Sequence, residues 1–94
     1  MSNRGKRHMQ RVRDLACVLC EHLGMQQQHP TEAHHLRDGA GAGQKNDDML
    51  TCALCEEHHR GASGVHGLGA RGFRTRYQME EIDLLAMTLE KLEP

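Results

Sequence analysis

The middle of the chain reads Met49-Leu50-Thr51-Cys52-Ala53-Leu54-Cys55-Glu56-Glu57-His58-His59, passing from an apolar run to a charged, histidine-rich one. The apolar part, residues 49–54, is short and bounded by turn-forming residues, which predicts a β-strand. We expect a short helix to begin near Cys55, so that His58 follows one helical turn later. A cysteine and a histidine at this spacing can bind the same cation.

Two pairs of cysteines have the C-x-x-C spacing, Cys17 with Cys20 and Cys52 with Cys55. Two such pairs in one small chain indicate a structural zinc site, because each pair can direct two thiolates at one ion. The expected set of zinc ligands is Cys17, Cys20, Cys55 and His58. In the alternative set Cys52 replaces His58. If Cys52 lies inside a strand, however, it acts as a small apolar residue.

The composition indicates a fold that depends on such a metal. The chain has 94 residues, one Phe, one Tyr and no Trp, and 37% of its residues are hydrophobic. A single domain of this size buries a limited apolar core, so zinc would supply part of its stability. The sequence contains no apolar run that suits a membrane span or a signal peptide. We therefore expect a cytoplasmic protein, in which paired cysteines bind metal rather than form disulfides.

Charge is unevenly distributed, although the net charge is only −1. Residues 1–13 contain no acid and carry the basic residues Arg4, Lys6, Arg7, Arg11 and Arg13. We interpret residues 1–13 as a flexible basic arm, which can run into a short helix, and residues 14–94 as a single domain. A basic arm suits the phosphate backbone of a nucleic acid, and a solvated tail is the alternative interpretation.

The other segments divide into a second strand, a helix and loops. Residues 33–36 predict a short strand that pairs with residues 49–54. Residues 79–92 predict an amphipathic helix whose apolar stripe belongs to the core: Met79, Ile82, Leu85, Leu89 and Leu92. The predicted loops are residues 21–32, 37–48 and 61–72, the last because it holds five of the ten glycines.

Several histidines stand beside the predicted zinc ligands. His34 and His35 are adjacent on the first strand, so their side chains point in opposite directions. One of them can hold a metal while the other lies on a different side of a substrate. His59 can face back towards this strand from the short helix, and His66 stands in the glycine-rich segment that follows. Two strands and one helix around a cation make a small, zinc-stapled α+β fold of the ββα-metal type.

These motifs resemble those of phage HNH (His-Asn-His) nucleases, and in particular the RecA-dependent recombination-enhancement (Ref) family. The resemblance covers roughly residues 15–92 and rests on His34-His35-Leu36-Arg37, on Asp48 through Gly61, on Gly64-Val65-His66-Gly67, and on Ile82 through Ala86 with Thr88. In such families a cysteine stands at the place of His58 and an apolar residue at that of Cys52. One departure is the family's asparagine, because Asn46 lies nine residues before Cys55 and Asp48 lies closer to the usual place.

The resemblance implies a metal-dependent DNA endonuclease acting in recombination in a bacterial host cell. His35 would be the general base, with Asp48 or Asn46 orienting it. His34 and His59 would hold one divalent cation, Mg²⁺ or Mn²⁺, with Zn²⁺ as the alternative, and His66 would be a third ligand or a phosphate donor. Further implied contacts are those of Arg37 and Arg60 with phosphates, and a recombinase filament is the implied protein partner.

A different class of function uses many of the same features. A catalytically inactive, zinc-dependent module that binds DNA or protein would need the same zinc site and basic residues. A metal sensor would need only the metal site. The hypotheses differ at His34, His35 and His59, because a binding module has no need of all three histidines around an open coordination position.

Overall fold

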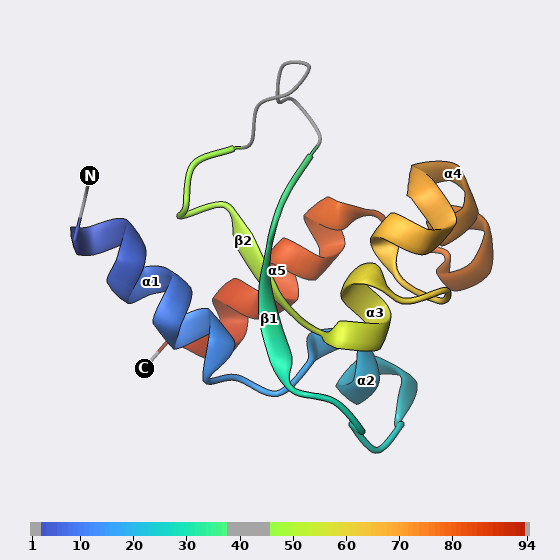
Figure 1. The fold of residues 1–94 in the computed structure, drawn as a ribbon, viewed down its shortest axis with the longest axis horizontal. Coiled ribbons are helices and arrows are strands. Elements are labelled where there is room, and N and C mark those ends of the chain that lie inside the picture. Colours follow the sequence, from blue (N-terminus) through green and yellow to red (C-terminus); the bar gives the residue numbers. More distant parts are fainter. Residues whose placement is uncertain (1–2, 38–45, 94) are drawn as a thin grey trace.

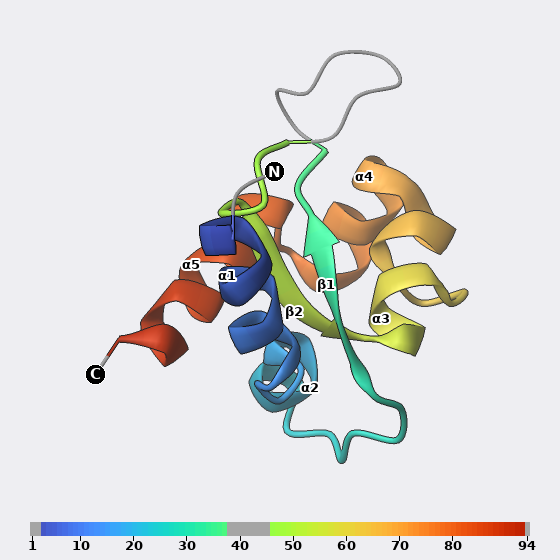
Figure 2. The same ribbon diagram turned by 60° about the vertical axis from the view of Figure 1, so that its left-hand side comes forward.

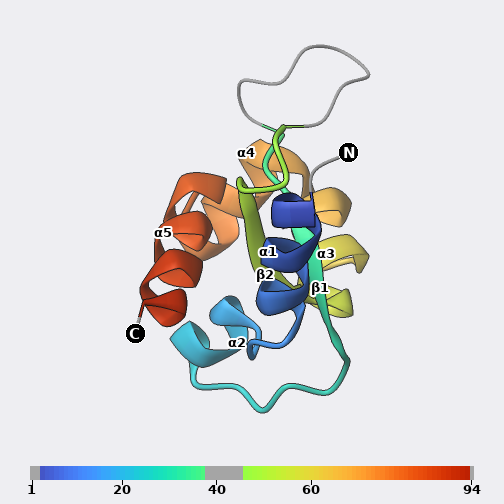
Figure 3. The same cartoon turned by 90° about the vertical axis from the view of Figure 1, so that its left-hand side faces the viewer.

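The computed structural model describes residues 3–37 and 46–93. In chain order its elements are α1 (Asn3–Arg13), α2 (Val18–Leu23), β1 (Thr31–His35), β2 (Thr51–Cys55), α3 (Glu56–Arg60), α4 (Val65–Tyr77) and α5 (Glu81–Leu92). They form a small α+β fold with a two-stranded sheet (Figure 1). Helix α1 lies on one side of the strands, and α3 and α4 lie on the other (Figures 1 and 2). Helix α5 packs against β2 and also contacts α1 and α2 (Figure 3).

The two predicted strands are confirmed, with shifts of one or two residues at their ends. They pair antiparallel, and His34 lies opposite Cys52 while His35 lies opposite Thr51. All five residues of β2 are buried, whereas His34 is the buried residue of β1. Strand β2 is covered because α1, α2, α3 and α5 all contact it. The short helix predicted after β2 is α3.

The C-terminal helix is confirmed, but the predicted core stripe is wrong in part. Ile82 is 59% exposed and Leu89 is 42% exposed. The buried face instead contains Leu84, Leu85 and Thr88. The Thr88 hydroxyl accepts a hydrogen bond from the Ala53 backbone N–H at 3.1 Å and donates one to the Leu84 carbonyl at 2.8 Å. The buried face of α5 therefore includes Thr88, a polar residue that is hydrogen-bonded to β2, whereas the apolar spacing predicts Leu89 there.

Helix α1 corrects the prediction of a flexible basic arm. Its buried residues are Gly5, His8 and Val12, and Val12 is fully buried. Their spacing puts them on one side of the helix, which contacts both strands. The apolar pattern of the sequence does not reveal this buried face, because Gly5 and His8 occupy positions where an amphipathic helix usually has leucine or valine.

Two predicted loops also contain helix. Residues 18–23 form α2, so the predicted loop 21–32 is helical at its start. Helix α4 covers much of the glycine-rich segment 61–72. It is kinked at Gly69, whose φ of 74° is a left-handed conformation that glycine adopts without strain. Buried Val65 and Phe73 anchor the helix on either side of the kink, so tertiary packing outweighs the low helix propensity of glycine.

Part of the predicted loop 37–48 falls on residues 38–45, which lie outside the described residues. Among the helices formed by residues 3–37 and 46–93, none has both the length and the apolar character needed to cross a bilayer.

Candidate metal centres

Four buried side chains form a cluster, here called the Cys/His cluster: Cys17, Cys20, Cys55 and His58. Cys17 is the N-cap residue of α2, where its sulfur accepts a hydrogen bond from the backbone N–H of Cys20. Cys55 ends β2, and His58 lies in α3. The ligand atoms all lie within 4.8 Å of one another. The structure thus brings together the predicted set of zinc ligands.

The spacing of these atoms fits a tetrahedral zinc ion. The Nδ1 atom of His58 lies 3.6 Å from the sulfur of Cys17, 3.5 Å from that of Cys20 and 3.4 Å from that of Cys55. The sulfurs of Cys20 and Cys55 are 3.8 Å apart. Zinc bonds of about 2.3 Å to sulfur and about 2.0 Å to nitrogen, at tetrahedral angles, space neighbouring ligand atoms by about 3.5 to 3.8 Å. The Cys/His cluster could therefore hold a metal such as zinc.

The protonation of the cluster depends on whether a cation is present. Burial raises the pKa of Cys20 to about 12, and the neighbouring Cys17 and Cys55 add to this rise. Burial also raises the pKa of Cys55 and lowers that of His58. The thiols of Cys20 and Cys55 therefore keep their protons on their own, whereas a cation would deprotonate the thiols that bind it.

Cys52 does not belong to the Cys/His cluster. It lies in the middle of β2, is fully buried and has a pKa that burial raises. The alternative ligand set, with Cys52 in place of His58, is thus not assembled. Cys52 packs as a small apolar residue, as its position in the strand predicts.

A second group consists of His34, His59 and His66 and is here called the three-histidine cluster. The residues come from β1, α3 and the first turn of α4. The ring centroids are 5.0 Å apart for His34 and His59, 5.1 Å for His34 and His66, and 4.9 Å for His59 and His66. One nitrogen of each ring lies within 4.8 Å of the others, so the predicted second set of metal ligands is also assembled.

Two of these three imidazole rings have a carboxylate as a hydrogen-bond partner. Nε2 of His34 is 2.5 Å from Oε2 of Glu81, and Nδ1 of His59 is 2.8 Å from Oε1 of Glu32. A carboxylate on one ring nitrogen commonly orients a metal-binding histidine and leaves the other nitrogen for the metal. Burial lowers the pKa of His59 and of His66, which favours the neutral imidazole that can act as a ligand.

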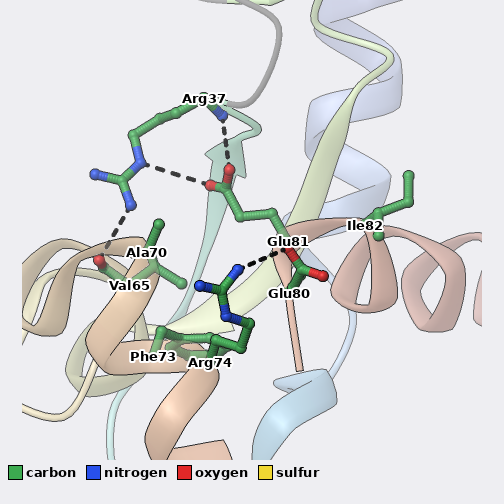
Figure 4. A pocket seen from close by; sticks show the side chains of 8 residues that line it. All are labelled: Arg37, Val65, Ala70, Phe73, Arg74, Glu80, Glu81 and Ile82. Atoms are coloured by element: carbon green, nitrogen blue, oxygen red, sulfur yellow. Dashed lines mark hydrogen bonds and ion pairs between the residues drawn. The ribbon is translucent and has the colours of Figure 1, made fainter. Parts of the chain in front are cut away.

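Arg37 and Arg60, the predicted phosphate contacts, lie against these same carboxylates. Arg60 makes a bidentate contact with Glu32, donating from Nε to Oε1 at 3.0 Å and from Nη2 to Oε2 at 2.8 Å. The backbone N–H of Arg37 donates to Oε1 of Glu81 at 3.1 Å, and its Nε is 3.6 Å from Oε2 (Figure 4). Whether either arginine also contacts a phosphate stays a prediction.

His35 leaves β1 on the opposite face from His34 and is not in the three-histidine cluster. Its Nε2 lies 2.8 Å from Oδ1 of Asp48. Asp48 in turn lies under α1, because a Cβ added to Gly5 would be 2.7 Å from Oδ2 of Asp48. Asn46, the other predicted partner, donates from Nδ2 to the Leu36 carbonyl at 2.8 Å.

A pocket of about 440 Å³ adjoins the three-histidine cluster through Glu81. Figure 4 shows it between α4 and the start of α5. Its lining combines arginines, glutamates and apolar side chains: Arg37, Val65, Ala70, Phe73, Arg74, Glu80, Glu81 and Ile82. The two arginines have carboxylate partners here, Glu81 for Arg37 and Glu80 for Arg74.

Sequence reasoning missed Glu32 and Glu81. The signal for Glu32 was available, since residues two apart on a strand share a face and Glu32 stands two before His34. For Glu81 there was no local signal, because 47 positions separate it from His34. The five predicted nucleic-acid contacts of α1 are all exposed: Arg4, Lys6, Arg7, Arg11 and Arg13.

Comparisons of the chain with protein-family models, with curated proteins and with solved structures gave no match.

Proposed function

We propose that this protein is a metal-dependent endonuclease of the HNH class, which hydrolyses DNA at a cation bound by the three-histidine cluster. The observation that carries the proposal is the convergence of His34, His59 and His66 from three separate elements. Structural zinc sites use four protein ligands, whereas catalytic sites keep a position open for water or substrate. The strand–strand–helix order of β1, β2 and α3 is in keeping with a ββα-metal core.

The donor set favours a particular kind of cation. Three imidazole nitrogens suit Zn²⁺ and other first-row transition ions, whereas Mg²⁺ prefers oxygen ligands. The proposed catalytic cation is therefore Zn²⁺, with Mn²⁺ as the more weakly bound alternative, in preference to Mg²⁺. A structural zinc ion at the Cys/His cluster would link α2 to β2 and α3, since its ligands come from these elements.

The proposed chemistry divides between the two faces of β1. A cation held by the three-histidine cluster would offset the negative charge that develops on the phosphate and on the leaving oxygen. His35 takes a proton from the attacking water, and Asp48, bonded to its Nε2, holds the ring. Because His34 and His35 point to opposite faces, the phosphodiester has to lie across the end of β1 to reach both.

DNA is the proposed partner, and α1 is the proposed surface that meets its backbone. The helix has five exposed basic residues and no acid. Such a surface suits phosphates without reading bases, so weak sequence preference is expected. A recombinase filament is a further proposed partner, which rests on the sequence resemblance alone.

A nicking assay on supercoiled plasmid tests the function. The parent protein is expected to nick DNA with Mn²⁺ or Zn²⁺, and His59→Ala to lose most of this activity. His22→Ala is the matched control, because His22 is exposed on α2 and outside both clusters. A parent protein inactive with every cation and with branched, single-stranded or recombinase-bound DNA would contradict the proposal.

The alternative is a zinc-dependent DNA-binding module without catalysis. The exposed basic face of α1 favours it, because that face needs nothing from the three-histidine cluster. In this case the parent and His59→Ala would bind DNA equally well, and neither would cleave it.

A further inference from the structure

His34 and His59, the two histidines that contact a carboxylate, each end a series of three interacting side chains, which is here called a chain. One chain runs from Arg60 through Glu32 to His59. The other runs from Arg37 through Glu81 to His34. The two chains share no residue, and both end at the three-histidine cluster.

The first chain has the geometry of a fixed support. Arg60 donates to both oxygens of Glu32, at 3.0 and 2.8 Å, and this bidentate contact fixes the plane of the carboxylate. Oε1 of the same carboxylate lies 2.8 Å from Nδ1 of His59. Glu56, 3.0 Å from Nη2 of Arg60, gives the guanidinium a second carboxylate partner.

The second chain joins elements that are distant in sequence. Glu81 lies at the start of α5, and Arg37 follows β1. The carboxylate of Glu81 accepts the Arg37 backbone N–H on one oxygen and faces His34 with the other. Nη2 of Arg37 also donates to the Val65 carbonyl at 3.2 Å (Figure 4), which ties the same arginine to the residue before His66.

An ionised carboxylate can only accept hydrogen bonds, so the ring nitrogen that faces it has to carry the proton. The other nitrogen of that ring then has a free lone pair. We propose that Arg60 and Arg37 are positioning residues that act through Glu32 and Glu81, so that His34 binds the cation through Nδ1 and His59 through Nε2. The inference rests on the proposed cation site but not on DNA cleavage.

The donors around both carboxylates agree with this assignment. Glu32 accepts hydrogen bonds from Nε and Nη2 of Arg60 at 3.0 and 2.8 Å, and Glu81 accepts one from the Arg37 backbone N–H at 3.1 Å. Both carboxylates therefore act as acceptors toward the groups that surround them.

The most direct test is the tautomer of each histidine in the intact, ¹⁵N-labelled protein loaded with two equivalents of Zn²⁺. Two-bond ¹H–¹⁵N correlation spectra distinguish a protonated ring nitrogen from a metal-bound one. The expected result is a protonated Nε2 with a zinc-bound Nδ1 for His34, and the reverse for His59. The opposite arrangement at either residue would overturn the inference.

Zinc affinity supplies the second test. Arg60→Gln is expected to weaken binding of the second Zn²⁺ equivalent about tenfold in a chelator competition, as outer-shell substitutions commonly do. Arg60→Lys is expected to bind the second Zn²⁺ more tightly than Arg60→Gln but less tightly than the parent, because lysine keeps the charge but not the bidentate contact. Arg74→Gln is the matched control, since Arg74 pairs with Glu80 at 3.7 Å, in a glutamate contact outside both chains.

Two outcomes separate this inference from the proposed cation site. Unchanged binding of the second Zn²⁺ in His59→Ala would contradict the site itself. Loss of binding in His59→Ala, with Arg60→Gln no weaker than Arg74→Gln, would contradict only the positioning role of Arg60. The first Zn²⁺ equivalent and the thermal unfolding curve show whether each variant is folded.

Discussion

Gly5 of α1 packs directly over Asp48, so closely that a Cβ at Gly5 would lie 2.7 Å from Oδ2 and 3.0 Å from Cβ of the aspartate. Asp48 in turn holds Nε2 of His35 at 2.8 Å. The N-terminal helix is thus part of the support of the proposed general base, although His35 itself lies on β1.

Gly5→Ala is expected to destabilise the protein by about 1–3 kcal/mol, because the added methyl group overpacks the contact with Asp48. Helix propensity alone gives the opposite sign, since alanine is favoured over glycine in a helix by about 1 kcal/mol. Urea unfolding of the parent and Gly5→Ala measures the difference. A more stable variant would show that the contact relaxes at little cost. Gln10→Ala, at an exposed position of α1, is the control.

His58→Ala is expected to abolish tight zinc binding at the Cys/His cluster and to unfold the protein at a lower denaturant concentration than Cys52→Ala does. Cys52→Ala is expected to keep one tightly bound zinc ion and to cost about 1–3 kcal/mol from lost packing. Metal analysis after exhaustive dialysis, followed by chemical unfolding, compares the two. Zinc loss in Cys52→Ala with retention in His58→Ala would reverse the assignment of the fourth ligand.

Acid is expected to destabilise the fold in part through His8. Burial, with the charge of Arg11, lowers the pKa of His8, while Asp47 and Asp48 oppose this shift. The folded state therefore holds His8 neutral, and the unfolded chain takes up a proton below about pH 6.5. The stability contributed by this group is present above that pH and is lost as pH falls towards the lowered folded pKa.

His8→Leu isolates this contribution, because protonation of the zinc ligands affects the parent and the variant alike. Relative to the parent, the variant is expected to gain stability as pH falls from 7 to 5.5. Nε2 of His8 is buried without a hydrogen-bond partner among the described residues, so leucine leaves no partner unpaired there. A difference in unfolding free energy that is the same at both pH values would contradict the prediction. His22→Leu is the exposed control.

The basic residues of α1 are expected to contact DNA phosphates. Lys6→Gln with Arg7→Gln should weaken DNA binding and reduce the slope of log affinity against log salt by about 0.9 for each lost contact. Both residues are exposed, so the fold is expected to be unchanged. Lys91→Gln is the control, because Lys91 already pairs with the carboxylate of Glu21. An unchanged slope would place the DNA elsewhere. Deleting residues 1–13 is not an equivalent test, because it also removes buried Val12.

His35→Ala is expected to reduce cleavage by about 10²–10⁴-fold, as loss of a general base typically does. Zinc content and DNA binding are expected to be retained, and added Mn²⁺ is not expected to restore activity. His59→Ala, by contrast, is expected to recover partly with excess Mn²⁺, because mass action refills a weakened site. Cleavage by His35→Ala at the parent rate would remove His35 from the mechanism.

Local spacing was enough to predict the Cys/His cluster, together with β2 and α3, which carry two of its residues. Cys17 and Cys20 occupy one turn around the start of α2, and Cys55 and His58 span the junction of β2 and α3. These ligands are paired by short-range geometry, which follows directly from helical and strand periodicity. The opposed directions of His34 and His35 follow from the same alternation. The C-terminal helix was predicted for a similar reason, since its apolar spacing extends over several turns.

Tertiary packing decided the features that no local pattern carries. The pairing of His34 with Glu81 depends on where α5 begins relative to β1, 47 residues apart in the chain. Burial of α1 depends on a glycine that lets the helix approach Asp48. Burial of Thr88 depends on the backbone N–H of Ala53 in β2, which donates to the Thr88 hydroxyl. Periodicity reports which side chains of a segment share a face, but the elements that cover this face belong to other parts of the chain.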